Sequence, residues 1–433
     1  MPQKVRLISA LVLAVLGLTG CWGQREIDEA AYMVAMGLDR GRRNNIVVTV
    51  AVGDVAGQGG TQSQTQGAQR WRSRIFSTVA PDVFAALSAI NSNLERQINP
   101  THLKMVVFSE NLARHGIDKY LDALVRWRQF RRTVYLAVSP GPARDVIRAV
   151  QPPTADNPGK FLEMVILTQK FVGYTITGQF LDFYNAYKTK GEAPIAFLIA
   201  PKQTGAGANQ NREDSGQTVG GPDVAATTGS DLFTKYGDPG KTTAGNTPEY
   251  GEAPLQAMGT AVFKKGKMIG KLNGNETMAL SMMRGEFQRA FIIIPDPQSL
   301  DKKIQIDVSQ IKKPAVKMES VGGGLIFKVK LYILSDMAGV QSQRSYELPK
   351  RIVEKAIGKW IAAQCRSVID KAQKNGADIF GFGDRARWLV PDWQAWRAYD
   401  YERKFRSAEI QLAIKVHINR TGLVLEKDAV KEE

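Results

Sequence analysis

The side chains best able to act as nucleophiles or metal ligands are scarce in this sequence of 433 residues. There are two cysteines, Cys21 and Cys365, and three histidines, His102, His115 and His417. The histidines lie far apart and show no ligand spacing, so metal catalysis through histidine is not expected. If Cys21 carries a lipid, as argued below, Cys365 has no partner for a disulfide within the chain. We then expect Cys365 to be a small buried hydrophobe on a helix rather than a reactive thiol.

Motifs of known catalytic sites are missing from the sequence. It contains no GxSxG elbow, no Walker loop, no HExxH and no CxxC. Gly381-Phe382-Gly383 is only a fragment of a dinucleotide fingerprint, and its glycines suit a tight bend better. Asp378 and Asp384 flank that bend, and we favour turn and cap residues over a carboxylate pair because Asp is common at such positions. We therefore predict no enzymatic activity, no catalytic residue and no cofactor.

Cys21 stands at the end of a segment with the features of a bacterial lipoprotein signal. Two basic residues precede the apolar run at residues 7–18, which as a helix rises about 18 Å, short of the roughly 30 Å of a bilayer core. The run ends in the tetrapeptide LTGC, which fits a lipobox. Its cysteine thiol can form a thioether with a diacylglyceryl group.

We therefore predict that residues 1–20 are removed and that Cys21 becomes an N-palmitoyl, S-diacylglycerol cysteine. Two acyl chains bind a membrane stably, which places the chain on its outer face. The alternative is an ordinary secretory signal with an accidental cysteine. The agreement of charge, apolar run and tetrapeptide favours the lipobox.

The charge of the chain favours anionic partners. Lys and Arg number 58 against 42 Asp and Glu, a formal net charge of +16. One cluster combines arginines with aromatic residues, a pattern that suits phosphate or single-stranded nucleic acid; it comprises Arg126, Arg128, Arg131 and Arg132 with Trp127 and Phe130. On an exported protein it is better placed to meet anionic head groups or an acidic partner, so no nucleic-acid partner is expected. A solvated helix end remains an open alternative.

Residues 21–200 are predicted to form an N-terminal α/β region, as one unit or as two subdomains. Hydrophobic periods of two and of 3.6 residues alternate along it, which favours layered strands and helices. The predicted strands are 31–40, 46–52, 72–79, 105–108, 134–138 and 195–199. The predicted helices are 81–98, 117–127, 145–150, 160–171 and 178–188.

Residues 201–253 are rich in Gly, Thr, Asn and other small polar residues, so they are predicted to be a flexible linker or surface insertion. Residues 254–433 are then predicted to be a C-terminal α+β domain, an antiparallel sheet packed on a long helix. Its predicted elements are a hairpin at 257–263 and 268–272, a helix capped by Asn273 and Glu276, strands at 290–294, 304–308, 313–319 and 325–334, a helix at 349–375 and a last strand at 410–418. The fold class is thus mixed α/β with several domains.

Three sequence blocks resemble the Ger(x)C family, the lipoprotein C subunits of spore germinant receptors. The first runs from Cys21-Trp22-Gly23-Gln24-Arg25-Glu26-Ile27 to Met36-Gly37-Leu38-Asp39. The second extends from Gly259-Thr260-Ala261-Val262-Phe263-Lys264 to Glu276-Thr277. The third is Gly376-Ala377-Asp378-Ile379-Phe380-Gly381-Phe382-Gly383, followed by the last strand and Thr421-Gly422. Gly23 stands where the family commonly has an acidic residue, and the 201–250 stretch is unusually long.

The resemblance implies a non-enzymatic subunit on the outer face of the spore inner membrane. It would assemble with two integral membrane partners, the A and B subunits, in a complex that senses small nutrients and triggers germination. A solute-binding lipoprotein of a transporter is the main alternative, but the two halves of the chain differ in pattern and a single linker joins them. A surface hydrolase has no nucleophile with a base to support it, and nucleic-acid binding rests on charge alone.

Overall fold

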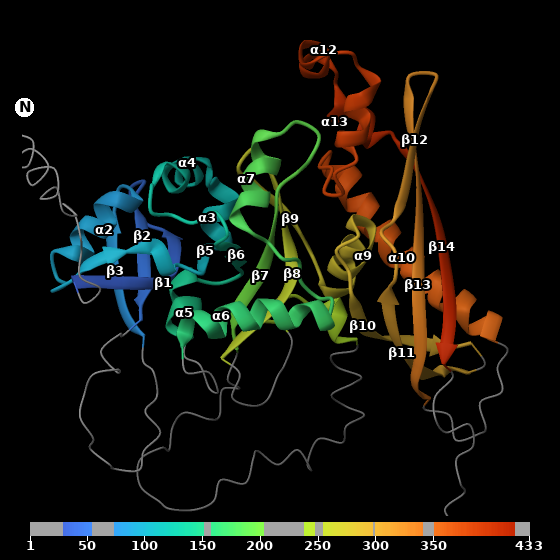
Figure 1. Cartoon of the computed structure of the whole chain (residues 1–433), viewed down its shortest axis with the longest axis horizontal. Coiled ribbons are helices and arrows are strands. Elements are labelled where there is room, and N and C mark those ends of the chain that lie inside the picture. The colour runs from blue at the N-terminus through green and yellow to red at the C-terminus, as the bar shows by residue number, and fades with distance from the viewer. Residues whose placement is uncertain are drawn as a thin grey trace, which may run out of the picture.

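The chain folds around two β-sheets that lie side by side, with helices between and around them (Figure 1). The computed structural model describes residues 29–53, 73–150, 157–202, 238–246, 254–297, 299–340 and 350–420. The mixed α/β class predicted from the sequence is confirmed.

The first sheet contains nine of the described strands in the order β3-β2-β1-β5-β6-β7-β8-β9, with the short β4 paired to β1. The four central strands β1, β5, β6 and β7 run parallel, and antiparallel strands flank them on both sides. The strands are β1 Ala30–Arg40, β2 Ile46–Val52, β3 Arg74–Ala80, β4 Gln97–Asn99, β5 Met105–Ser109, β6 Tyr135–Ser139, β7 Ile195–Pro201, β8 Leu255–Lys264 and β9 Lys267–Leu272.

Helices cover both faces of this sheet, as a parallel core requires (Figure 1). One face packs on α2, α3, α4 and α7 through residues such as Leu87, Leu121 and Phe180. The other face packs on α5 and α6 through residues such as Ile147 and Phe161. The helices are α2 Val83–Asn91, α3 Glu110–His115, α4 Asp118–Arg126, α5 Ala143–Arg148, α6 Pro158–Leu167 and α7 Phe180–Lys188, and short 3-10 turns occur at Pro100–His102 and Thr168–Phe171.

Asp39 at the end of β1 caps the first turn of α5. Asp39 is buried, and its two carboxylate oxygens accept the backbone N–H groups of Ala143 at 2.7 Å and Arg144 at 2.9 Å. These N–H groups belong to the first turn of a helix, where no backbone partner exists. Two residues earlier, a Cβ on Gly37 would lie 2.8 Å from Cγ1 of Ile147, so only glycine lets α5 pack this closely on β1. The Gly-Leu-Asp of the first sequence block therefore has a structural role.

The second sheet contains five of the described strands in the order β10-β11-β13-β12, with β14 paired to β13. Its strands alternate between buried and exposed residues, since one face packs on the long helix α10 and the other meets solvent. The elements are β10 Arg289–Asp296, β11 Ser299–Gln310, β12 Ala315–Val321, β13 Gly324–Val340, β14 Glu409–Arg420, α9 Gly274–Arg284, α10 Lys350–Asn375, α11 Gly383–Ala386, α12 Trp393–Ala398 and α13 Tyr401–Arg406, with a 3-10 turn at Arg387–Leu389. A C-terminal sheet packed on a long helix is thus confirmed.

One strand pair in this sheet is parallel, which the sequence pattern does not indicate. Strand β14 begins beside Ile326, near the start of β13, and the two run in the same direction. A parallel pair needs a long crossover, and α10 to α13 provide it. Helices α12 and α13 were not predicted from the sequence.

Three local expectations differ from the structure. The helix predicted over 81–98 ends at Asn91, after which Ile98 is buried on β4 instead. The hairpin of β8 and β9, predicted within the C-terminal region, extends the first sheet by pairing with β7. Residues 238–246, within the predicted linker, are packed: Asp238 accepts a 2.6 Å hydrogen bond from Asn275. The other residues of 201–253, apart from 201 and 202, lie outside the described ranges, and a domain boundary in this stretch stays a prediction.

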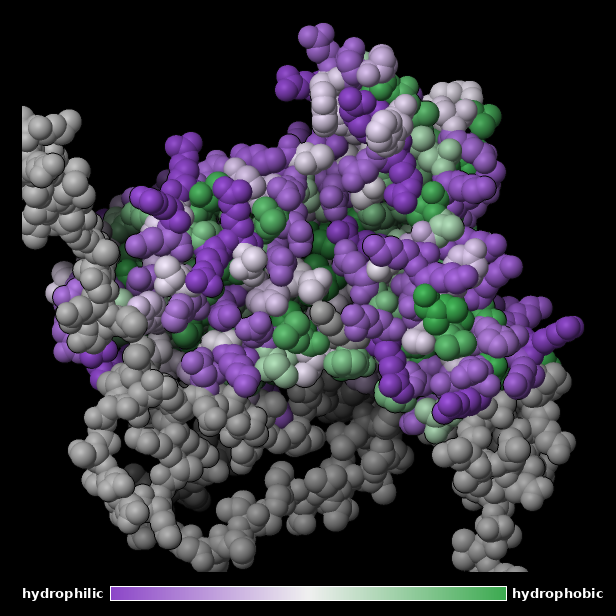
Figure 2. All heavy atoms as spheres, in the orientation of Figure 1, coloured by the Kyte–Doolittle hydropathy of each residue, from purple (hydrophilic) through white to green (hydrophobic). Residues whose placement is uncertain are grey.

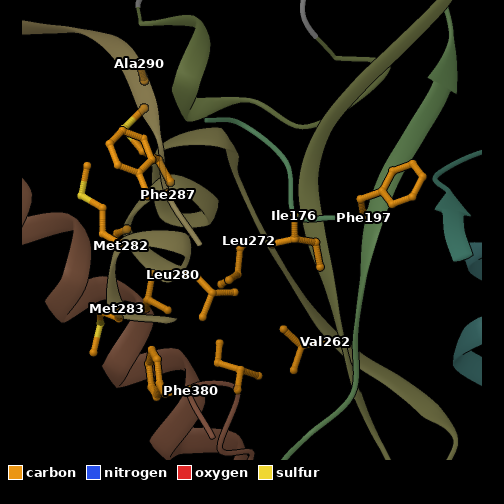
Figure 3. Close-up of a cluster of buried hydrophobic side chains, with 14 of the residues drawn as sticks. Ile176, Phe197, Val262, Leu272, Leu280, Met282, Met283, Phe287, Ala290 and Phe380 are labelled. Atoms are coloured by element: carbon orange, nitrogen blue, oxygen red, sulfur yellow. The ribbon is translucent and has the colours of Figure 1, made fainter. Parts of the chain in front are cut away.

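The hydrophobic core is continuous from the first sheet to the second. Figure 3 shows Leu272 and Val262 of the first sheet toward Leu280 of α9 and Phe380, which follows α10, while Phe197 lies farther away; all five belong to one cluster of buried residues. On the face seen in Figure 2 the surface is mostly hydrophilic, with hydrophobic residues in small separate groups. The two sheets are therefore held together by shared apolar burial as well as by the chain.

Replacing Asp39 with Ala should lower the free energy of unfolding by about 1–2 kcal/mol, because two first-turn N–H groups of α5 lose their acceptor. Urea denaturation of the purified protein measures this. Asp145→Ala in the same helix is the matched control, since the Asp145 carboxylate pairs with the side chain of the exposed Arg144, at 3.5 Å. Equal effects of the two substitutions would contradict the capping role.

Candidate functional site

The predicted lipidation site, Cys21, lies outside the described residues, together with the start of the first sequence block and Thr421-Gly422. The remaining candidates are described and are taken in turn. Among the described helices, none is long and apolar enough to span a membrane.

Asp378 and Asp384 do not form a carboxylate pair. Asp384 is exposed in α11, whereas Asp378 is buried and accepts the N–H groups of Phe380 and Gly383 and the hydroxyl of Tyr401. Burial raises the pKa of Asp378 to about 6, although these three hydrogen bonds oppose the shift. The turn role predicted for Asp378 is confirmed, and its burial beneath α13 comes from the tertiary fold.

Cys365 is fully buried on the core-facing side of α10, as its position after Ile361 predicts. Burial raises the pKa of its thiol to about 12, so the reactive thiolate is rare at neutral pH. The structural role predicted for Cys365 is confirmed.

The three histidines remain separate in the structure. His115 is the last residue of α3 and exposed, and His417 is exposed on β14, with Nδ1 3.7 Å from a carboxylate oxygen of Glu354. His102 stacks on Tyr32 with 4.4 Å between ring centres. Within the described ranges, no group of three His, Cys, Asp or Glu side chains is arranged to hold a metal ion.

The basic cluster does not form a stacking surface for nucleic-acid bases. Its four arginines are exposed, but the two aromatic rings pack against the protein. Trp127 meets Phe84 edge to face at 5.7 Å, and Phe130 is buried against Phe180 at 5.0 Å. Because stacking needs an exposed ring face, the buried Phe130 is not available to a base, and Trp127 is half-buried.

The second sequence block forms the joint between the two sheets. The Glu276 side chain completes the predicted capping box at the start of α9, where it accepts the N–H of Asn273 at 3.0 Å. It also accepts the Ser367 hydroxyl at 2.7 Å and the Lys371 ammonium at 2.6 Å, both from α10. The adjacent Thr277 hydroxyl pairs with Thr260 of β8 at 3.0 Å. One carboxylate thus links α9, next to the first sheet, to the long helix under the second.

The third sequence block forms a second contact at the same joint. Gly383 packs directly against the backbone of Gly191, where a Cβ has no room. The N–H of Ala193 donates to the carbonyl of Asp378 at 2.7 Å. Nearby, the Arg284 guanidinium donates to Glu192 at 2.8 Å and to the carbonyl of Ile379 at 2.9 Å. Burial would lower the pKa of Arg284, but the carboxylates of Glu286 and Glu192 raise it, so it stays charged.

A cavity of about 550 Å³ opens at the end of the first sheet at which the central strands β5 and β6 begin. The backbone there is fixed by two hydrogen bonds: the N–H of Lys104 donates to Val34 at 2.9 Å, and the N–H of Tyr135 donates to Lys104 at 2.8 Å. The cavity walls also include Tyr32 and Arg131. Sequence reasoning missed this site, because its residues are distant in the chain and only the pairing of β1, β5 and β6 brings them together.

The fold and these contacts define a protein of two connected α/β units, in which the described motif residues serve packing and capping. Residues 23–201 match the family described as "Spore germination protein N-terminal domain". Residues 258–422 match "Spore germination B3/ GerAC like, C-terminal". The chain therefore belongs to the GerAC-like family of spore germination proteins, which confirms the resemblance seen in the sequence blocks. This family is not one of enzymes, as the sequence predicted.

Relatives of similar length align along almost the whole chain. Spore germination protein KC of Bacillus subtilis (strain 168) is 25% identical over 430 residues, which cover 98% of this chain and 97% of that protein. The putative spore germination protein YfkR of the same strain is 24% identical over 426 residues, covering 96% of each. The crystal structure of the GerBC protein shares the fold, with a TM-score of 0.50 and 16% identity over 89% of this chain and 96% of that one.

Substituting Glu276→Gln should destabilise the chain by about 1–3 kcal/mol at pH 7, because a buried charge-assisted network is lost. Burial alone would raise the pKa of Glu276, but the hydrogen bonds from Lys371, Ser367 and the Asn273 N–H lower it below its ordinary value of 4.5. The ionised group therefore stabilises the fold above about pH 4.5, and this contribution is lost as the pH falls through the lowered pKa.

Urea unfolding of the wild type and the Gln variant across this pH range tests the prediction. The difference between them should shrink in acid, and Lys371→Met should remove most of it in a double-mutant cycle. A difference that is constant with pH would contradict the assignment.

Cys365 should be inert in the native protein. In a Cys21→Ala chain it is the only thiol, and Ellman's reagent should label it on the order of 100-fold more slowly in buffer than in urea, because it is buried and its pKa is raised. Rapid labelling of the native chain would show that α10 opens readily or that Cys365 is accessible.

Proposed function

We propose that this protein is the lipid-anchored C subunit of a spore germinant receptor and that it acts by assembling with two integral membrane partners, the A and B subunits. Family membership along nearly the whole chain supports the role in germination. The lipobox ending at Cys21 supports the anchor, with N-palmitoyl and S-diacylglycerol groups on that cysteine. The observation that carries the proposal is the combination of this signal with a germination family fold.

The anchor would confine the folded part to the outer face of the spore inner membrane. From Cys21 to Glu29, the first described residue, the chain spans eight residue steps. Fully extended, these reach at most about 30 Å, so β1 would begin close to the membrane surface. Tethering a folded unit this near the bilayer would raise its effective concentration at membrane partners and so favour its binding to them.

Assembly rather than chemistry agrees with how the described residues are used. Among the described residues of the three sequence blocks, polar groups such as Asp39 and Glu276 join elements of this chain. Contacts with the A and B subunits would therefore involve the surface outside those blocks, and no nucleic-acid contact is proposed.

Replacing Cys21 with Ala should impair nutrient-triggered germination while spore formation stays normal, because the unlipidated chain would not be retained at the membrane. Germination is measured by the fall in optical density of purified spores after nutrient addition, and retention by immunoblots of spore membranes. The control is Cys365→Ala, which alters a buried thiol but not the anchor. Normal germination and membrane retention of the Cys21→Ala protein would overturn the proposal.

A further inference from the structure

The cavity at the start of β5 and β6 has the size and charge of a ligand-binding site. Its volume of about 550 Å³ falls in the range of small-molecule sites and exceeds what a bare inorganic ion fills. Its walls come from β1, the residues that lead into β5, the segment that leads into β6 and carries Arg131, and the start of α6, with Gly53 after β2 and Gln179 before α7 completing them. The strand pairing that brings these together is part of the core, so the site is pre-formed.

Two cations and one carboxylate face this cavity. Lys104 Nζ lies 3.1 Å from Glu163 Oε2, so this pair is largely compensated. Arg131 also lines the cavity, and no carboxylate of the described residues pairs with it. The site therefore has a net positive charge with one guanidinium free to bind.

This positive charge affects the pKa of His102, which also lines the cavity. Burial and then the charges of Arg131 and Lys104 lower the pKa of the His102 imidazole. The ring is stacked on Tyr32 and stays neutral at pH 7, so it offers a hydrogen bond without adding charge. A positive potential that disfavours a third cation favours an anion in the same place.

The start of α6 borders the cavity but is already satisfied. The Asn157 side chain accepts the N–H groups of Gly159 and Lys160, so these donors are not free for a ligand. Recognition thus falls to the side chains of Arg131, Lys104 and His102. A guanidinium presents two parallel N–H donors that match phosphate oxygens, and a dianion gains more from the positive potential than a single carboxylate does.

We propose that this cavity binds an organic phosphate, with Arg131 as its main contact. The phosphate could belong to a soluble phosphate ester or to the head group of a membrane lipid, since both present the same chemistry. The short reach from Cys21 to β1 would place the cavity near lipid head groups, but binding itself does not depend on the anchor.

The experiment uses the chain from residue 21 to 433 with Cys21→Ala, at low salt. Calorimetry with glycerol 3-phosphate tests the soluble source, and co-sedimentation with phosphatidylglycerol vesicles, against phosphatidylcholine vesicles, tests the lipid source. Arg131→Gln should weaken binding at least about 10-fold. The matched control, Arg128→Gln, removes an exposed arginine of the same segment that does not line the cavity and should leave cavity binding unchanged.

A second variant tests the sign of the electrostatics. Glu163→Gln removes the only carboxylate that the cavity presents among the described residues and releases Lys104, so affinity should increase several-fold. Binding of either ligand with this pattern supports the proposal and identifies the source. The proposal is overturned if neither ligand binds, or if Arg131→Gln and Arg128→Gln weaken binding equally. Either result is independent of the germination phenotype of Cys21→Ala.

Discussion

The arrangement of the two sheets depends on the hydrogen bonds that the buried Glu276 carboxylate accepts. A buried carboxylate is costly unless its oxygens receive hydrogen bonds, and here they receive them from Asn273, Ser367 and Lys371. Because the donors come from α9 and α10, the charge is satisfied only when these helices are correctly placed. Apolar packing alone would tolerate sliding between them, whereas this network specifies one position.

The sequence blocks that carry the family resemblance are explained by the same kind of constraint. Asp39 receives the first N–H groups of α5, Asp378 holds a bend under Tyr401, and Gly383 allows direct backbone contact with Gly191. Each is a place where only one or two residue types satisfy a buried polar group or fit the available space. The described residues of the blocks therefore build the two halves of the chain and join them.

Since the described residues of these blocks serve packing and capping, the proposed function rests on the proposed anchor at Cys21, on the surface and on the cavity. The proposed anchor and the start of β1 are separated by only a short stretch of chain, and the cavity lies at the edge of the sheet where β1 begins. The shared core and the Glu276 network connect the two sheets. In the proposed assembly, this connection would help to hold the membrane partners in a fixed relation.

The sequence by itself determined the elements whose signals are local. The strands 31–40 and 46–52, the capping box at Asn273 and the buried side of α10 follow from residue spacing and backbone chemistry within a few turns. Cys21 is also predicted from the sequence alone, because enzymes that process such a signal act on a linear segment.

Only the tertiary structure decided how these elements pair. Apolar spacing continues past Asn91, but Ile98 is buried on a strand, so spacing could not locate the end of α2. The residue patterns of β8 and β14 do not reveal which neighbouring strand each one joins or in which direction it runs. The cavity at Lys104 and Arg131 is likewise absent from any local pattern. The pairing of strands is set by contacts between residues far apart in the chain, and these contacts form only when the whole core is assembled.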